Sequence, residues 1–296
     1  MIVVRAAESD ADLEAWRRVF MAVVPNERAT TVEQMRTTAR RDLLRLLAEV
    51  DGEVVGSGIA GRSDLVGAAS LAPRVVPSAR RRGVGTELLR TLARHAESLG
   101  VDVVGANVDD AGSLAFAERY GFHEIDRQIE QVRAVGHEDL PTAPRGVEIV
   151  SVAARPELWP VAYEVVGAQA FEDMALVAPI EASLAEWEQD WISDPEAMFV
   201  AVADGQVVGC AGLILDDDQP HRAENALTAV RRDWRGRGVA AALKRTTLAW
   251  AARNGVGEVY TWTQRGNADM RRLNEHLGYT TRSESITVRA PLPLAI

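Results

Sequence analysis

The feature that most constrains this fold is an internal repeat, because two parts of the chain carry the same landmarks in the same order. The pattern Asp-Gly-x-Val-Val-Gly occurs at 51–56 and again at 204–209, an offset of 153. Gly83 recurs as Gly238 at an offset of 155, and the pair Gly-Phe at 121–122 recurs as Gly-Tyr at 278–279, an offset of 157. Offsets that drift so little indicate duplication of a domain-sized unit.

A short polar segment separates the two repeats. Residues 137–146 contain Pro141 and Pro144, carry several polar side chains and show neither helical nor strand periodicity, which is typical of a linker. A chain of 296 residues also suits two domains of ordinary size. We therefore expect an N-terminal domain at 1–136, a linker at 137–146 and a C-terminal domain at 147–296.

Within the first repeat, the hydrophobic pattern alternates between strand and helix periods. Short apolar runs predict strands at 2–5, 43–50, 54–60, 68–76, 101–108 and 123–135. Apolar residues at helical spacing predict helices that start near Ser9 and lie at 31–40, 86–99 and 113–120. The expected fold class is α/β, with two tandem domains, each a mixed, mostly antiparallel sheet flanked by helices.

The composition limits the functions that the chain can have. It is 47% apolar and 26% charged, as in soluble globular proteins, and its net charge of −10 argues against nucleic acid as a partner. The single cysteine, Cys210, leaves no intramolecular disulfide and fits a cytoplasmic location. We expect no membrane partner, because no apolar run could span one and no signal peptide is recognisable. The expected state is a monomer or homodimer that acts on a small molecule.

Each repeat carries a basic, glycine-containing turn where a strand gives way to a long helix. The first reads Arg80-Arg81-Arg82-Gly83-Val84-Gly85-Thr86, and the second reads Arg235-Gly236-Arg237-Gly238-Val239-Ala240. Small residues let a ligand approach the backbone, and the first helical turn has N–H groups without intrahelical partners. The helix dipole and the arginines add positive charge. Two copies in matching context therefore favour a pyrophosphate site over ordinary turns with solvated arginines.

The order of hairpin, Arg/Gly turn, long helix, strand, short helix and Gly-Phe/Tyr resembles the GNAT superfamily of acyl-CoA-dependent N-acyltransferases over nearly the whole chain. The resemblance implies an N-acetyltransferase with acetyl-CoA as co-substrate and an unidentified primary amine as acceptor. It also implies that the turns bind the pyrophosphate and that the preceding strands bond the pantetheine arm. The residues assigned to acetyl-CoA in this way are Val75, Val76, Arg80, Arg81, Arg82, Gly83, Val84, Gly85, Thr86, Ala229, Val230, Arg235, Gly236, Arg237, Gly238, Val239, Ala240 and Asn267.

A short helix near the end of each repeat is a second element of this resemblance. In the second repeat it starts at Asn267, which would cap the helix near the co-substrate arm. Many GNAT enzymes place a tyrosine five residues before the final aromatic, where it protonates the leaving thiolate. That position is Ala117 in the first repeat and Asn274 in the second, so Asn274 is a candidate without an acidic group. A thiol with a pKa of about 8.5 can leave without an acid.

Direct attack on a thioester requires a neutral amine, so a group must remove the proton of the ammonium. Glu224, just before the strand expected at 225–230, is the candidate base or holder of a water. Its alternative is a solvated carboxylate at a strand end. Cys210 is expected in the core, as are Trp187 and Trp191, whose i, i+4 spacing also fits the wall of a substrate groove.

Three functions stay open at this point. The first is acetyl transfer to an unidentified amine. The second is a narrower version of the first, a mycothiol-synthase-like acetyltransferase. The third is a non-catalytic sensor or scaffold that binds acyl-CoA. The signals for the active repeat point in different directions, because the first turn is the more basic while the second repeat has Glu224 and Asn267.

Overall fold

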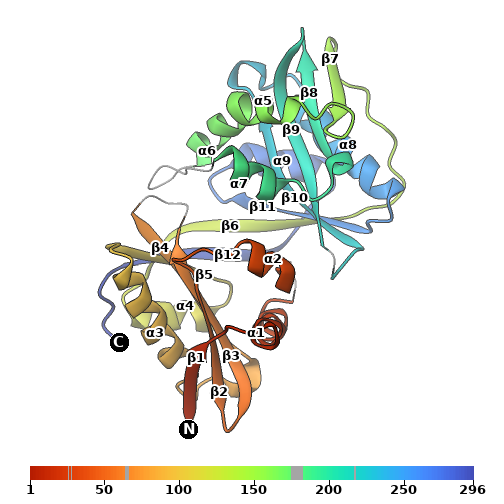
Figure 1. Ribbon diagram of the computed structural model, residues 1–296. Coiled ribbons are helices and arrows are strands. Elements are labelled where there is room, and N and C mark those ends of the chain that lie inside the picture. Colours follow the sequence, from red (N-terminus) through yellow and green to blue (C-terminus); the bar gives the residue numbers. More distant parts are fainter. Residues whose placement is uncertain (26, 28, 64–66, 175–182, 217) are drawn as a thin grey trace. The chain divides into compact units, whose positions relative to one another are not determined.

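The computed structural model describes residues 1–25, 27, 29–63, 67–174, 183–216 and 218–296, and Figure 1 shows their elements. The chain divides into two compact units, Met1–Arg127 together with Ser285–Ile296, and Gln128–Glu284. They are called unit 1 and unit 2 below. None of the helices in the described ranges is long and apolar enough to cross a membrane.

Unit 1 is built on a mixed sheet with the strand order β1-β2-β3-β4-β5-β12. Its pairs are antiparallel except β4 with β5, which is parallel. The strands are β1 (Ile2–Ala6), β2 (Leu44–Val50), β3 (Glu53–Arg62), β4 (Ala68–Val75), β5 (Val103–Val108) and the last residues of β12 (Thr280–Pro291). The helices are α1 (Asp10–Val23), α2 (Val32–Thr37), α3 (Val84–Ser98) and α4 (Ala111–Arg119), with a short 3-10 turn at Pro77–Ala79.

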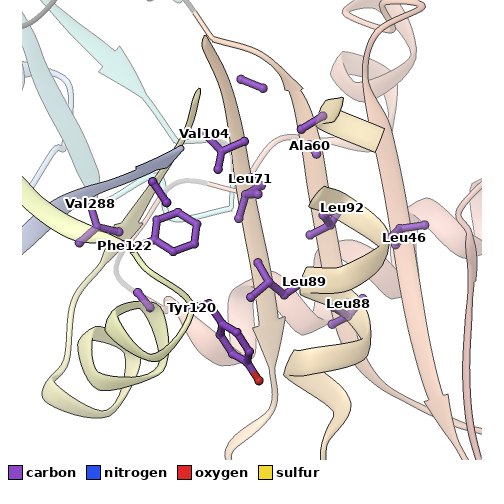
Figure 2. Close-up of a cluster of buried hydrophobic side chains, with 14 of the residues drawn as sticks. Leu46, Ala60, Leu71, Leu88, Leu89, Leu92, Val104, Tyr120, Phe122 and Val288 are labelled. Carbon is purple, nitrogen blue, oxygen red and sulfur yellow. The ribbon is translucent and has the colours of Figure 1, made fainter. Parts of the chain in front are cut away.

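The sequence explains where these helices begin and which face they bury. Ser9 and Thr31 each form a capping box with the residue three positions on, which satisfies N–H groups at the starts of α1 and α2. In α3, Leu88, Leu89 and Leu92 lie on one face and are buried. Figure 2 shows these leucines among the core side chains of the unit. The packed core fixes the start of α3, where the first Arg/Gly turn ends.

Unit 2 has the strand order β6-β11-β10-β9-β8-β7, again with one parallel pair, β10 with β11. The strands are β6 (His123–Ala134), β7 (Val147–Ser151), β8 (Met198–Ala203), β9 (Gln206–Leu215), β10 (Arg222–Val230) and β11 (Glu258–Gln264). The helices are α5 (Leu158–Ala162), a π-helical turn at Tyr163–Gly167, α6 (Ala168–Met174), α7 (Leu184–Trp191), α8 (Val239–Arg253) and α9 (Ala268–His276). Short 3-10 turns lie at Pro195–Ala197 and Arg232–Trp234.

The last strand of each sequence repeat contributes to the compact unit of the other repeat. Residues 128–134 of β6 pair with β11 in unit 2, and residues 286–291 of β12 pair with β5 in unit 1. The domains expected at 1–136 and 147–296 therefore describe the sequence repeats, whereas the compact units exchange their final strands. The segment 137–146 contains no helix or strand and lies within unit 2.

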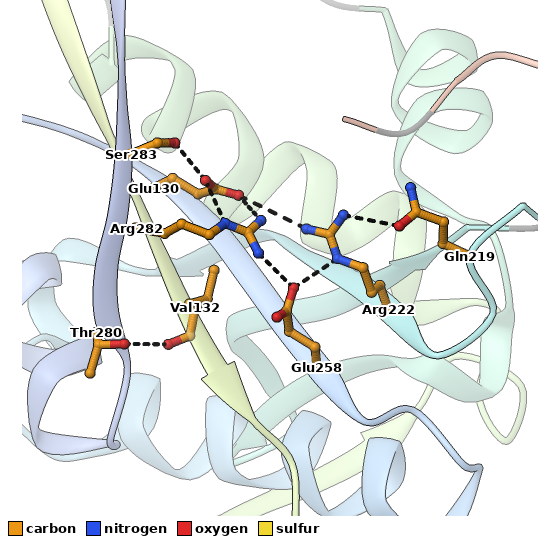
Figure 3. A network of polar contacts seen from close by, with 8 residues as sticks. All are labelled: Glu130, Val132, Gln219, Arg222, Glu258, Thr280, Arg282 and Ser283. Carbon is orange, nitrogen blue, oxygen red and sulfur yellow. Dashed lines mark hydrogen bonds and ion pairs between the residues drawn. The ribbon is translucent and has the colours of Figure 1, made fainter. Parts of the chain in front are cut away.

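A buried ionic network holds the start of β10 in unit 2. Arg282 Nε donates to Glu130 Oε2 at 2.9 Å, and Arg282 Nη1 donates to Glu258 Oε1 at 2.9 Å. Glu258 Oε1 also accepts from Arg222 Nε at 2.7 Å, and Ser283 Oγ donates to Glu130 Oε2 at 2.6 Å. Figure 3 shows Arg282 between the two carboxylates. Because Arg222 is the first residue of β10, this network anchors one end of the strand that enters the candidate site.

Candidate active site

The two Arg/Gly turns have the same backbone conformation. Gly83 and Gly238 are the N-cap residues of α3 and α8, with φ of 87° and 82°, a left-handed conformation that favours glycine. The position two residues earlier is also left-handed, with φ of 63° at Arg81 and 74° at Gly236. Each turn leads into a helix of 15 residues. The unpaired N–H groups and the dipole at the start of such a helix stabilise an anion.

The arginine that opens each turn has the same contact in both units. Arg80 Nε donates to the carbonyl of Val75 at 3.2 Å, and Arg235 Nε donates to the carbonyl of Val230 at 3.1 Å. Each arginine thereby joins the turn to the end of the preceding strand. A guanidinium group also has two terminal nitrogens, which are the atoms that bond a phosphate. In unit 2, Arg235 Nη2 already donates to Asp173 Oδ2 at 2.5 Å.

Several of the residues assigned to acetyl-CoA from the sequence have a buried side chain or a polar group that already has a partner within the protein. The side chains of Val84 and Val239 are buried, so these residues offer N–H groups and not side chains. Thr86 Oγ1 lies 2.9 Å from the hydroxyl of Tyr120, with which it forms a hydrogen bond. The N–H of Val76 donates to the carbonyl of Val55 at 3.0 Å and is engaged within the sheet. The fit of the turns to a pyrophosphate therefore depends on backbone geometry and arginines.

In both units the strand that precedes the turn pairs with its parallel partner only at the start of the two strands. Residues 68–70 of β4 pair with 103–105 of β5, and residues 222–224 of β10 pair with 258–260 of β11. Beyond these pairs, β4 continues to Val75 and β10 to Val230, where the turns begin. Main-chain groups on the outer part of a diverging strand can bond an extended ligand. This arrangement fits a pantetheine arm that runs from the turn along β4 or β10.

A β-bulge distinguishes β10 from β4. In the pairing of β10 with β9, Asn225 lies opposite Leu213 and Thr228 lies opposite Ala211. The chain therefore advances three residues along β10 over the same span in which it covers two residues of β9. One extra residue is therefore inserted. The pairing of β4 with β3 is continuous from Ala69 to Val75. A bulge turns backbone groups away from the ladder, and such N–H groups can stabilise an oxyanion.

Glu224 is half-buried and lies one residue before this bulge, where it pairs with Tyr260 of β11 and Ile214 of β9. Its neighbour Ala223 packs in the core beneath α8, and Asn225 contacts a side chain of α8. Because side chains alternate along a strand, Glu224 points to the opposite face. Its carboxylate thus lies beside the diverging strands β10 and β11, on the face of the sheet opposite to α8.

The corresponding face of unit 1 has a different character. By register with the parallel partner, Ser70 takes the place of Glu224. Nearer the turn, Arg74 places its guanidinium 4.6 Å from the ring centroid of Phe20 and 5.8 Å from that of Trp16, both in α1. Unit 1 thus keeps the turn and the diverging strands but has a hydroxyl, instead of a carboxylate, at this position.

The structure gives different roles to the two asparagines that the sequence analysis assigned at the start of α9 and within it. Asn267 is the N-cap residue, and its Oδ1 accepts from the N–H of Met270 at 3.1 Å, which confirms the expected cap. Asn274 is completely buried, and its Nδ2 donates to Gln131 Oε1 at 2.9 Å. A carboxamide in this environment can position neighbouring strands, but its N–H protons are not acidic enough to be transferred to a thiolate.

Sequence reasoning missed Lys244, which lies in α8 and is 1% exposed. Its Nζ donates to Oδ1 of Asn225 and lies 5.4 Å from the ring centroid of Tyr279. Burial lowers the pKa of the Lys244 ammonium to about 7. The repeat itself carries a signal for this residue, because the offset that aligns Gly83 with Gly238 places Lys244 opposite Leu89, a core leucine.

Two other residues lie where core packing was expected. Cys210 is buried, and desolvation raises the pKa of its thiol to about 12, which makes a thiolate nucleophile unavailable at neutral pH. Trp187 is completely buried and stacks on Trp159 with ring centroids 4.9 Å apart. The side chain of Trp191 lies outside the described part of the chain.

Comparison with known proteins identifies the family. The profile of the acetyltransferase (GNAT) family matches residues 10–122 and 167–279, one match in each repeat. A mycothiol acetyltransferase of Brachybacterium faecium is 31% identical, over 78% of this chain and 70% of its own length. Another, of Thermomonospora curvata, is 27% identical over 88% of this chain and 87% of its own.

Solved structures with the same fold include two that cover nearly the whole chain. A GCN5-related N-acetyltransferase of Sphaerobacter thermophilus aligns with a TM-score of 0.77 and 20% identity, over 98% of this chain and 95% of its own. A tandem GNAT protein from the clavulanic acid biosynthesis pathway aligns with a TM-score of 0.76 and 22% identity, over 98% of each chain. The protein belongs to the GNAT family of acetyltransferases and carries two GNAT repeats in tandem.

Proposed function

We propose that this chain transfers the acetyl group of acetyl-CoA to a primary amine and that unit 2 carries out the transfer. The observation that supports this choice is the bulge in β10, with Glu224 one residue before it. Unit 2 also contains the turn at 235–240 and the diverging strands. Unit 1 shares the last two features but has Ser70 in place of Glu224 and a continuous register in β4.

The residues of unit 2 divide the work of an acyl transfer between them. N–H groups of the turn and the start of α8, with Arg235, hold the pyrophosphate. Glu224 accepts the proton of the acceptor ammonium, directly or through one water, and the neutral amine then attacks the thioester carbonyl. Backbone N–H groups of the bulge stabilise the oxyanion. The thiolate takes its proton from solvent, because Asn274 has no acidic proton.

The names of the relatives narrow the acceptor. The two relatives found by sequence, from Brachybacterium faecium and Thermomonospora curvata, are called mycothiol acetyltransferases, and each match covers two thirds or more of both chains. We propose a mycothiol-type amine as the first acceptor to test. Simple primary amines serve as the comparison, since they share only the reacting group with that acceptor.

Steady-state release of CoA thiol, measured with acetyl-CoA and these amines, tests the proposal. We expect Glu224→Gln to lower kcat by roughly 10²-fold, the scale of general base catalysis, and to leave the Kd of CoA nearly unchanged. Ser70→Ala, at the matching position of unit 1, is the control and should leave kcat unchanged. Binding of CoA without thiol release for any amine would instead support a non-catalytic acyl-CoA sensor.

A further inference from the structure

Asn225, where the register of β10 shifts, ties three elements of unit 2 together. Its Nδ2 donates to the carbonyl of Gly212 in β9 at 2.9 Å, and its own carbonyl accepts from Thr261 Oγ1 in β11 at 2.8 Å. Its Oδ1 accepts from Lys244 Nζ of α8. Asn225 is 1% exposed, so water has little access to replace any of these partners.

The bond from Lys244 determines which way the carboxamide of Asn225 faces. An ammonium or amine donates to Oδ1 and directs Nδ2 toward the carbonyl of Gly212. If the carboxamide turned over, Oδ1 would face that carbonyl, and two acceptors would lie against each other. Because Gly212 lies opposite the bulge, the orientation of Asn225 and the shape of the bulge depend on each other.

Unit 1 provides an internal comparison at the same positions. Leu89 occupies the place of Lys244 and packs in the hydrophobic core, as Figure 2 shows. Unit 1 also has the continuous register in β4. The buried lysine and the bulge thus occur in the same unit. A leucine would fill this core position without the desolvation cost of an amine, and a costly polar residue at one of two equivalent positions indicates a role beyond packing.

We propose that Lys244 is a positioning residue for acetyl transfer, which acts through Asn225 to fix the β10 bulge in the conformation that receives the thioester carbonyl. This inference rests on the proposed function of unit 2. Lys244 does not touch the reacting atoms. It holds Asn225, and Asn225 holds the strand whose N–H groups face the developing oxyanion. The role belongs to unit 2 alone, because Leu89 makes no polar bond in unit 1.

Two variants of Lys244 separate positioning from packing. Lys244→Met keeps the length of the side chain and removes the donor, whereas Lys244→Gln keeps an uncharged donor for Oδ1 of Asn225. We expect Lys244→Met to lower kcat roughly tenfold or more, with the Kd of CoA changed less than about twofold. Lys244→Gln should recover a substantial part of kcat. Leu89→Met, the matched change in unit 1, should leave kcat unchanged.

Hydrogen exchange of the amides at 225–228 gives a readout that does not require turnover. Exchange there should be faster in Lys244→Met than in wild type, while Leu89→Met leaves it unchanged. If wild type showed no turnover but exchange responded as expected, the proposed function would fail and the link from Lys244 to the bulge would stand. Wild-type kcat in Lys244→Met, or equal losses of kcat and CoA affinity with unchanged exchange at 225–228, would overturn the positioning role.

Discussion

Asp173 Oδ2 accepts a hydrogen bond from Arg235 Nη2 at 2.5 Å. A carboxylate of α6 is therefore bound to the arginine that opens the second turn. Asp173 Oδ1 also accepts from Arg232 Nη2 at 2.7 Å, and Glu172 Oε2 accepts from the same nitrogen at 3.0 Å. Burial opposes ionisation of Asp173, but the bonds from Arg232 and Arg235 outweigh it and lower the pKa of its carboxyl. A bound pyrophosphate would therefore have to compete with these carboxylates for the same guanidinium groups.

Asp173→Asn should therefore tighten the binding of CoA to unit 2. The ion pairs are partly exposed, and exposed pairs contribute about 0.2–1 kcal/mol. Release of Arg235 should lower Kd by up to roughly fivefold, as measured by calorimetry at low salt. Asp269→Asn, which removes an exposed ion pair with Arg272 in α9, controls for the change in net charge. An equal gain in both variants would show that Asp173 does not compete with the co-substrate.

Substitutions at the two N-cap glycines should separate the units by function. Gly83→Glu and Gly238→Glu both place a side chain on a left-handed residue, at a similar cost of about 1–2 kcal/mol in stability. Each also puts a negative charge where a pyrophosphate would bind. We expect Gly238→Glu to weaken CoA binding by roughly tenfold or more and to abolish turnover. Gly83→Glu should leave kcat intact, and calorimetric stoichiometry would reveal any site lost in unit 1. Loss of turnover in Gly83→Glu alone would place the chemistry in unit 1.

The parts of this structure that local patterns control were predictable from the sequence. The helix expected at 86–99 is observed as α3 (Val84–Ser98), and the strand expected at 123–135 as β6 (His123–Ala134). The repeat, the GNAT fold and the capping role of Asn267 are likewise confirmed. Periodicity, turn glycines and cap residues act within a few positions of the chain, so a single sequence is enough to read them.

Features that depend on distant partners were not predictable. The final strands of the two repeats, β6 and β12, each have 12 residues, and their own patterns do not decide which sheet they join. The bond between Lys244 and Asn225 spans 19 positions, and only a comparison of the repeats singles out the lysine. The contact of Asp173 with Arg235 spans 62 positions and follows from packing of α6 near the turn.

Removal of Glu130 should destabilise unit 2 strongly. Its side chain is buried and accepts bonds from Arg282 and Ser283. Glu130→Ala leaves these donors without that acceptor, and breaking a buried ion pair in this way costs about 3–5 kcal/mol. Urea unfolding should show the loss. Glu157→Ala, which removes an exposed pair with Arg155, should change stability far less, because water screens an exposed pair. Similar effects of the two variants would mean that the network does not anchor β10.

Lys244→Met should make the protein more stable at neutral pH, by an amount that shrinks as the pH rises. In the folded chain burial lowers the pKa of Lys244 from 10.5 to about 7. Between these values the unfolded chain binds a proton that the folded chain has released, so wild-type stability rises with pH across this range. Well below pH 7 both states are protonated and the full penalty applies, on the order of 5 kcal/mol; at pH 7 it is on the order of 4 kcal/mol.

The methionine variant has no such titration, although it leaves Oδ1 of Asn225 without the lysine donor, at a cost of about 1–3 kcal/mol. The net gain at pH 7 should therefore be about 1–3 kcal/mol. Chemical unfolding of both proteins from pH 6 to pH 9.5 measures the difference. The two stability curves should run parallel below pH 7 and converge above it, and Leu89→Met should follow the wild-type curve. A constant difference over the whole range would show that Lys244 does not titrate near neutral pH in the folded protein.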